Sequence, residues 1–195
     1  MRLAVVDDVE RDRQMLITAV QRYMDVQRID VQAVGFASGL EFLQAFSPGS
    51  FAIVFLDIYM EEMSGMETAY RVRQVDKDCL LIFVTSSDGH AVEGFRVRVF
   101  HYLVKPYSEQ QLYDVLALCC QLLVEEARFL EVKEGRTIIR LLHKSLLFAD
   151  TEQHYVRLHT LDRVIKIRMS FHELEALLRD DARFLTCCRN VLVNM

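Results

Sequence analysis

Short apolar segments alternate with segments of helical periodicity from the start of the chain to about residue 125. The apolar segments are RLAVVDD, RIDVQAV, FAIVFLD, CLLIFVTS and VFHYLVKP. Most of them are continuous rather than alternating, which is typical of strands buried on both faces of a sheet. Strands that alternate with helices predict an α/β fold with a parallel sheet and helices on both faces. We expect five strands in the doubly wound, flavodoxin-like order 2-1-3-4-5, alternating with five helices.

Helical periodicity is clearest in residues 11–24, 39–46 and 66–75, where apolar side chains recur three and four residues apart. This spacing places them on one face of a helix. A last helix is predicted to begin at SEQQ and to extend toward Glu126. Ser108 and Gln111 have the spacing of a capping box, in which each side chain bonds the other residue's backbone.

The pattern changes after about residue 127. The segments FLEVKEGRTIIRL, HKSLLFADTE, HYVRLHT and DRVIKIRMS are short, rich in β-branched residues and separated by polar turns, which predicts antiparallel strands. A helix is expected from Phe171 through HELEALLRD, and FLTCCRNVLVNM is expected to form one further strand. We therefore predict two domains, at residues 1–122 and 128–195, with a short linker at residues 123–127.

Composition indicates a globular protein, with 52% hydrophobic and 26% charged residues among 195. No apolar run is long enough to cross a membrane, and the N-terminus lacks the pattern of a signal peptide, so we expect a cytoplasmic protein without membrane insertion. The five cysteines are an odd number without metal-knuckle spacing, and we expect them to be small core residues rather than disulfides.

Charge is distributed unevenly along the chain. Residues 1–127 carry 11 Lys+Arg and 19 Asp+Glu, a net charge of −8, whereas residues 128–195 carry 12 and 9, a net charge of +3. The second part also has four of the six histidines. An acidic first part and a mildly basic second part favour two modules, the second of which would face a polyanion.

Polar residues able to bind a metal ion or take part in a reaction stand where the predicted strands end: Asp7 and Asp8, Asp57, Thr85 and Lys105. The carboxyl ends of parallel strands meet at one edge of the sheet, so these side chains are expected to converge. Clustered carboxylates favour Mg²⁺ as a hard, oxygen-bound ion, and a lysine with a hydroxyl favours an anion. Together they predict phosphoryl transfer onto Asp57. Each aspartate taken alone is more often a turn or capping residue; the ordered set carries the prediction.

The stretches VVDD, LDIYMEEMSGME, FVTSS and YLVKP resemble the receiver domain of two-component response regulators over about residues 1–122. The resemblance implies that Asp57 accepts phosphate from a sensor histidine kinase. It also implies that Asp7, Asp8, Asp57 and the main-chain carbonyl of Tyr59 bind Mg²⁺, that Thr85 and Lys105 hold the phosphoryl oxygens, and that Tyr102 is the switch aromatic. It further implies a cis bond before Pro106 and a loop glycine at Gly65.

One feature excludes another class of phosphoaspartyl protein, and a second feature departs from the common receiver pattern. Haloacid dehalogenase-like enzymes need a second aspartate two residues after the nucleophile, and position 59 is tyrosine, so that class is excluded. Receivers often have proline four residues after the acceptor. Here Glu61 stands there, followed by Glu62, and we expect both carboxylates to face water.

The stretches FADTEQHYVRLHT, RMSFHELEALL and FLTCCRNVLVN are similar to the LytTR DNA-binding domain of LytR/AlgR regulators. The resemblance implies DNA contacts at His154 and Arg189, with Asn190 as an additional candidate. The family commonly has CHRS where this chain has CCRN, so Cys188 replaces a histidine. Three further basic residues could neutralise phosphates: Arg157, Lys166 and Arg168.

A LytTR domain normally continues beyond LVN, so the resemblance also implies that this domain is incomplete at its C-terminus. Our leading hypothesis is a response regulator that controls transcription, is not an enzyme beyond slow loss of its own phosphate, and forms a homodimer on promoter direct repeats when phosphorylated. The dimer is expected through the face between the fourth strand and the last receiver helix. One alternative is a truncated regulator that accepts phosphate and dimerises but binds DNA poorly. Another is a β-domain that recognises a protein.

Overall fold

The computed structural model describes residues 1–86 and 97–195. The chain divides into two compact units, a first unit at Met1–Cys120 and a second unit at Gln121–Met195. The fourth helix expected from the sequence follows Thr85 and falls on residues that lie largely outside the described ones, so that expectation is not tested.

The first unit is built on a five-stranded parallel sheet in the order β2-β1-β3-β4-β5, which confirms the predicted topology. Its strands are β1 (Arg2–Val6), β2 (Gln32–Phe36), β3 (Ile53–Leu56), β4 (Leu80–Thr85) and β5 (His101–Val104). The central strands β3 and β4 are buried along their whole length. Continuous apolar segments therefore became interior strands, as expected when helices cover both faces of a sheet.

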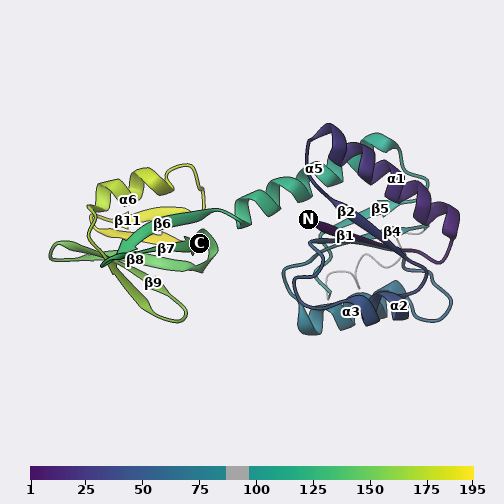
Figure 1. Ribbon diagram of the computed structural model, residues 1–195, viewed down its shortest axis with the longest axis horizontal. Helices are drawn as coiled ribbons and strands as arrows, with labels where there is room; N and C mark the ends of the chain where they lie inside the picture. The colour runs from purple at the N-terminus through teal and green to yellow at the C-terminus, as the bar shows by residue number, and fades with distance from the viewer. Residues whose placement is uncertain (87–96) are drawn as a thin grey trace. The chain divides into compact units, whose positions relative to one another are not determined.

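Helices cover the sheet on both sides. They are α1 (Glu10–Val26), α2 (Gly39–Ala45), α3 (Gly65–Val75) and α5 (Glu109–Glu126). Figure 1 shows α1 and α5 on one face of the sheet and α2 and α3 on the other. Serine side chains cap α2 and α3, and the predicted capping box at the start of α5 is present, with Gln111 N donating to Ser108 Oγ at 3.2 Å and Ser108 N donating to Gln111 Oε1 at 2.8 Å.

Strand β2 begins later than the segment RIDVQAV predicted. Arg28 has a positive φ of 57°, and the backbone N–H of Ile29 donates to the carbonyl of Met24. The left-handed Arg28 and this hydrogen bond close the C-terminal turn of α1, and they use residues that the apolar pattern assigned to the strand. The strand is therefore displaced to Gln32–Phe36.

The second unit contains a hairpin, a five-stranded antiparallel sheet and one helix. The hairpin is β6 (Phe129–Glu134) with β7 (Thr137–Leu142), and a short 3₁₀ turn, η1 (His143–Ser145), follows it. The sheet has the order β10-β9-β8-β12-β11. Its strands are β8 (Leu146–Glu152), β9 (Tyr155–Thr160), β10 (Val164–Ile167), β11 (Phe184–Cys188) and β12 (Val191–Asn194). The predicted antiparallel β architecture is thus confirmed.

Helix α6 (Phe171–Leu178) starts where the sequence predicted, with a complete capping box between Ser170 and Glu173. Leu174 and Leu178 on this helix pack into one core with apolar residues of the β6–β7 hairpin and of the five-stranded sheet. The helix is therefore placed by the burial of one apolar face and by satisfied backbone groups at its start.

The C-terminal segment was predicted as one strand, and that prediction is wrong. FLTCCRNVLVNM forms two antiparallel strands, β11 and β12, with a tight turn at Arg189 and Asn190. A bulge between Thr186 and Cys188 precedes the turn. Asparagine is a favoured turn residue, but no glycine or proline marks the position, so the apolar residues on both sides hid it.

The cysteines only partly follow the prediction. All five are free, and Cys79 and Cys119 are buried in the first unit, as expected. Cys187 and Cys188 are exposed, because they lie at the end of an edge strand rather than in a core.

Residues 123–126, predicted as part of a linker, belong to α5. Among the described residues no helix is both long and apolar enough to span a membrane.

Candidate functional site

Three of the predicted site residues meet at the carboxyl edge of the parallel sheet. Asp7 follows β1, Asp57 follows β3, and Lys105 follows β5. The Lys105 Nζ atom lies 2.8 Å from Asp7 Oδ2 and 3.0 Å from Asp57 Oδ2. The topology brings together residues 98 and 48 positions apart because parallel strands all end at the same edge.

Both aspartates are buried and held by backbone groups as well as by the lysine. Their side chains are 4% and 9% exposed, respectively. Asp7 Oδ1 accepts a hydrogen bond from the Val9 N–H at 2.9 Å, and Asp57 Oδ1 accepts one from the Tyr59 N–H at 3.1 Å. Each carboxylate therefore has one oxygen fixed by its own loop and the other directed at the ammonium group, which fixes the orientation of both.

The electrostatics of the site follow from burial and pairing. Burial raises the pKa of Asp7, and the hydrogen bonds from Lys105 and Val9 offset that rise only in part. Burial opposes the charged form of Lys105, but hydrogen bonds to Asp7, Asp57 and Asp12 outweigh it and raise the pKa of Lys105 above its usual value. Lys105 therefore stays cationic and is the positive charge between the carboxylates.

A third carboxylate, which the sequence analysis did not single out, also binds Lys105. Asp12 Oδ2 lies 3.0 Å from Lys105 Nζ, and Asp12 stands in the first turn of α1. Its only signal in the sequence was its position at the start of the helix that follows the first strand. Acidic residues are common at helix N-termini for reasons of the helix dipole alone, so the signal was not specific.

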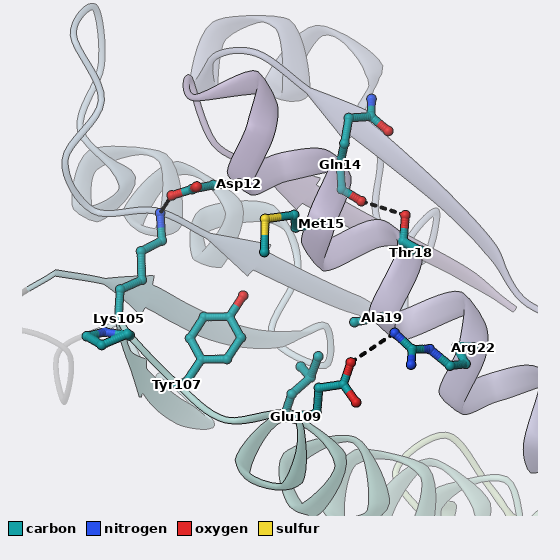
Figure 2. Close-up of a pocket in the computed structure, with 11 residues that line it drawn as sticks. Asp12, Gln14, Met15, Thr18, Ala19, Arg22, Lys105, Tyr107 and Glu109 are labelled. Carbon is teal, nitrogen blue, oxygen red and sulfur yellow. Dashed lines mark hydrogen bonds and ion pairs between the residues drawn. The ribbon is translucent and has the colours of Figure 1, made fainter.

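Asp12 and Lys105 lie at one end of a cavity of about 700 Å³ between α1 and the segment leading into α5. Figure 2 shows the Asp12–Lys105 ion pair at one end and the Arg22–Glu109 ion pair at the other, with the Tyr107 ring between Lys105 and Glu109. Apolar atoms contribute most of the wall between the two pairs, from Met15, Ala19 and Leu112 among others.

The other predicted residues of the first unit lie around this centre. Asp8 is exposed, and its Oδ2 accepts from the Glu61 N–H at 3.3 Å, which ties the first loop to the loop after β3. Thr85 is fully buried at the end of β4, and its carbonyl accepts from the Lys105 N–H at 2.8 Å. Tyr102 is half-buried on β5, with its ring 5.4 Å from that of Phe83.

No group of three or more His, Cys, Asp or Glu side chains is gathered as for a metal ion within residues 1–86 and 97–195. The charge between the two buried aspartates is instead supplied by Lys105. The chemistry of the site nevertheless suits a hard divalent cation, because the buried carboxylates of Asp7 and Asp57 both turn an oxygen toward the same cationic group.

The loop after β3 shows why glycine is needed at position 65. The Gly65 N–H donates to the carbonyl of Ile58 at 3.0 Å, and a Cβ on Gly65 would collide with the backbone carbonyl of Asp57. The loop therefore packs directly against the predicted acceptor. Glu61 and Glu62 in the same loop are exposed, as expected, and the Lys105–Pro106 bond is cis, also as expected.

In the second unit, the predicted DNA-contact residues lie in two turns at the same end of the five-stranded sheet. His154 is exposed in the turn between β8 and β9, and Arg189 and Asn190 are exposed in the turn between β11 and β12. Strands β8 and β12 are neighbours, and Asp150 near the end of β8 pairs with Val191 at the start of β12. The two turns therefore leave the sheet side by side.

Of the three additional basic residues, only Arg168 joins this end of the sheet without a carboxylate partner among the described residues. It is exposed, directly follows β10, and lines a small pocket together with His154. Arg157 instead forms a two-pronged ion pair with Asp150, at 2.6 and 2.7 Å, and Lys166 pairs with Glu152 at 2.7 Å. The charges of these two side chains are already largely balanced within the sheet.

Comparisons with known proteins match both units. Residues 3–117 match the response regulator receiver domain, and residues 136–195 match the LytTr DNA-binding domain. The chain is 25% identical to the sensory transduction protein LytT of Oceanobacillus iheyensis, over all of this chain and 81% of that protein. It is 24% identical to LytT of Bacillus subtilis, over all of this chain and 83% of that protein.

Solved structures resemble the first unit. The response regulatory domain of protein mrkE from Klebsiella pneumoniae is 27% identical with a TM-score of 0.54, and the match covers 63% of this chain and 97% of that one. The response regulator TrrA from Thermotoga maritima, solved in complex with Mg²⁺ and BeF, is 26% identical with a TM-score of 0.53, over 60% of this chain and 97% of that one.

Proposed function

The chain belongs to the response regulators that combine a receiver domain with a LytTR DNA-binding domain, and we propose that phosphorylation of Asp57 by a sensor histidine kinase controls its binding to DNA. Two-component transcriptional regulation is the function consistent with both domains. The observation that carries the finer proposal is the Lys105 ammonium, held within 3.0 Å of both Asp7 and Asp57 at the sheet edge.

The chemistry proposed for Asp57 is the transfer of a phosphoryl group from a phosphohistidine. An oxygen of the Asp57 carboxylate attacks phosphorus, a new O–P bond forms, and the N–P bond to the histidine breaks so that the imidazole leaves with the electron pair. The Tyr59 N–H holds one carboxylate oxygen, which leaves the oxygen near Lys105 as the nucleophile. Lys105 then offsets charge on the transferred group, as positioned cations do in phosphoryl transfer.

Mg²⁺ is the cofactor of this proposal, and its bound form in TrrA, a relative by structure, supports it. Asp7, Asp8, Asp57 and the Tyr59 carbonyl would hold the ion. When bound, it would supply positive charge to the phosphoryl oxygens. Burial raises the pKa of the Asp7 carboxyl, and a divalent cation bound beside it would favour the ionised form.

The proposed readout runs from Thr85 and Tyr102 to the second unit. Thr85 would bind a phosphoryl oxygen, and Tyr102, half-buried against Phe83, would change its packing as Thr85 moves. The phosphorylated form would make a homodimer and place two LytTR domains on a promoter direct repeat, with His154, Arg189 and Asn190 contacting DNA. The cytoplasm is the compartment in which such a regulator would meet both its kinase and its DNA.

The proposal is tested with the whole chain and its Asp57→Asn variant. Incubation with a small phosphodonor and Mg²⁺ should produce a phosphorylated species, separable by gel mobility, only when Asp57 is present. A genomic-DNA pull-down with and without beryllofluoride, which mimics the phosphoryl group, should enrich a few upstream repeats only with the mimic. A phosphorylated species in the Asp57→Asn variant would contradict the assignment of the acceptor. A dimer with the mimic but without DNA enrichment would favour a regulator that accepts phosphate without a DNA output.

A further inference from the structure

All three hydrogen-bond donors of the Lys105 ammonium are engaged by carboxylates. Nζ contacts Asp7 at 2.8 Å, Asp57 at 3.0 Å and Asp12 at 3.0 Å. A lysine ammonium has three N–H groups and no more. A phosphoryl group on Asp57 therefore meets a lysine whose donors are already distributed among three acceptors.

We propose that Asp12 is a positioning residue that competes with the phosphoryl group for Lys105 and thereby weakens the phosphorylated state. This inference rests on the proposed function of Asp57 as phosphoacceptor. Two of the three carboxylates change role when the site is loaded, because Asp57 carries the phosphoryl group and Asp7 is a predicted Mg²⁺ ligand. Asp12 is the partner of Lys105 whose role does not change when the site is loaded.

Exposure distinguishes Asp12 from the other two acceptors. Its side chain is 39% exposed, whereas those of Asp7 and Asp57 are almost fully buried. Asp12 therefore has water as an alternative partner and lies outside the buried pair, in the first turn of α1 and at the end of the cavity shown in Figure 2. It is placed to draw the ammonium away from the acceptor without taking part in the transfer.

The direction of the effect follows from charge. A phosphoryl group brings about two negative charges to the site. Asp12 adds a further negative charge on the same ammonium, so it repels the incoming group and shares the cation that would hold it. Removing the charge of Asp12 weakens its hold on the Lys105 ammonium and strengthens the interaction of that ammonium with the phosphoryl group. Because the pair is partly exposed, the effect is a modest one.

The test is the binding of beryllofluoride at saturating Mg²⁺, and of Mg²⁺ alone, measured by calorimetry on the whole chain. Asp12→Asn is expected to bind beryllofluoride about threefold more tightly, the scale of a partly exposed ion pair. Mg²⁺ alone is expected to bind equally well or more weakly, because the variant loses a negative charge. A general loosening of the structure would move both affinities in the same direction, so this split identifies the competition.

Two further variants define the contact. Asp12→Glu keeps the charge and is expected to behave as the unaltered chain does. Glu10→Gln removes an exposed charge from the same first turn of α1 and is expected to leave beryllofluoride binding unchanged, because Glu10 has no contact with Lys105 among those the structure describes. Thermal unfolding of each variant verifies that it is folded.

The outcomes separate this inference from the proposed function. Beryllofluoride binding that is unchanged or weaker in Asp12→Asn overturns the competition while leaving Asp57 as the acceptor. An equal gain in Glu10→Gln also overturns it, because the effect would then be long-range charge rather than the contact with Lys105. A folded, unaltered chain that binds no beryllofluoride in the presence of Mg²⁺ removes the proposed function and this inference with it.

Discussion

Lys105 is the residue on which the charge balance of the sheet edge depends. It lies between two buried carboxylates, and removing one member of such a group leaves the others uncompensated. Its own side chain is 19% exposed, so water replaces part of what is lost. The ion pairs of Lys105 therefore offset the cost of burying the two carboxylates and contribute little net stability beyond that.

We expect Lys105→Met to lower the free energy of unfolding of the first unit by about 2 kcal/mol at neutral pH. The pKa of Asp7 is already raised by burial, and without the lysine it rises further. A folded state that binds protons more tightly than the unfolded state gains stability as pH falls, so acidification from neutral pH toward the unfolded-state carboxyl pKa should recover part of the loss. Chemical denaturation across pH measures this, and added Mg²⁺ should also restore stability.

Lys77→Met is the matched control for that experiment. Lys77 is an exposed lysine of the same unit, so its replacement should cost little at any pH. Equal losses in the two variants, or a Lys105→Met loss that grows on mild acidification, would contradict the role given to Lys105 as the counter-charge.

Gly65 is also important as a single residue, but for steric rather than electrostatic reasons. A methyl group at this position meets the backbone of Asp57, which cannot move aside as a flexible side chain would. We expect Gly65→Ala to cost about 1–3 kcal/mol of stability and to reduce beryllofluoride binding, because relief of the clash displaces the acceptor. Calorimetric unfolding and beryllofluoride titration measure the two effects.

Gly49→Ala provides the contrast to Gly65→Ala. Gly49 has a positive φ of 75°, but nothing lies within 4 Å of a Cβ built there. Its replacement should cost about 1 kcal/mol of backbone strain while leaving beryllofluoride binding intact. If Gly65→Ala bound beryllofluoride normally, the loop would not be what positions Asp57.

At the scale of elements, a buried ion-pair cluster joins the segments around the five-stranded sheet of the second unit. Asp181 follows α6 and is almost fully buried, with its Oδ2 2.8 Å from His143 Nδ1 in η1 and 2.6 Å from an Arg183 guanidinium nitrogen. The hydrogen bonds from Arg183 have the largest effect on the pKa of Asp181 and lower it. Burial opposes them, and the hydrogen bond from His143 adds to the lowering. The pKa of Asp181 is therefore held well below its usual value. The cluster therefore stabilises the ionised carboxylate.

Asp181→Asn is expected to lower the free energy of unfolding of the second unit by about 2–3 kcal/mol at neutral pH. A depressed carboxyl pKa contributes stability that is present above the unfolded value of about 3.9 and is lost as pH falls below it. The difference between the unaltered chain and the variant should therefore be constant at neutral pH and shrink below about pH 4. Denaturant unfolding at several pH values tests this, and a difference that widened on acidification would contradict it.

Elements also show what the sequence predicted and what it did not. The parallel sheet and the meeting of Asp7, Asp57 and Lys105 were predictable, because continuous apolar strands imply a parallel sheet whose ends share an edge. The strand order itself was chosen from the flavodoxin-like class and does not follow from the apolar pattern. The turn at Arg189–Asn190 was not, because apolar residues flank it and no glycine or proline marks it. Asp12 was missed since its role depends on where α1 begins relative to β5, a tertiary relation that spacing along the chain does not encode.

For the molecule as a whole, net charge says little about which basic residues would meet DNA. The second part of the sequence has a net charge of only +3, and the structure divides the four basic residues considered for DNA contact into two classes. Arg157 and Lys166 are paired with carboxylates on the sheet, whereas Arg168 and Arg189 stand exposed at the end that also presents His154. Only the second class has charge available for phosphates.

The salt dependence of DNA binding should therefore separate these two classes. With the whole chain and beryllofluoride present, Arg168→Ala and Arg189→Ala should each reduce the slope of log affinity against log salt concentration by about 0.9, the value for one lost phosphate contact. Lys166→Ala, which removes a lysine already paired with Glu152, should leave the slope nearly unchanged. Fluorescence anisotropy on a duplex recovered in the genomic pull-down, measured over a range of salt concentrations, provides the slopes. An equal reduction in all three variants would mean that DNA contacts the face of the sheet rather than the turns at its end. Arg189→Ala could instead leave the salt slope unchanged and lower the affinity for the recovered duplex but not for other DNA. That result would assign Arg189 to a base edge, because base contacts carry sequence preference without releasing counterions.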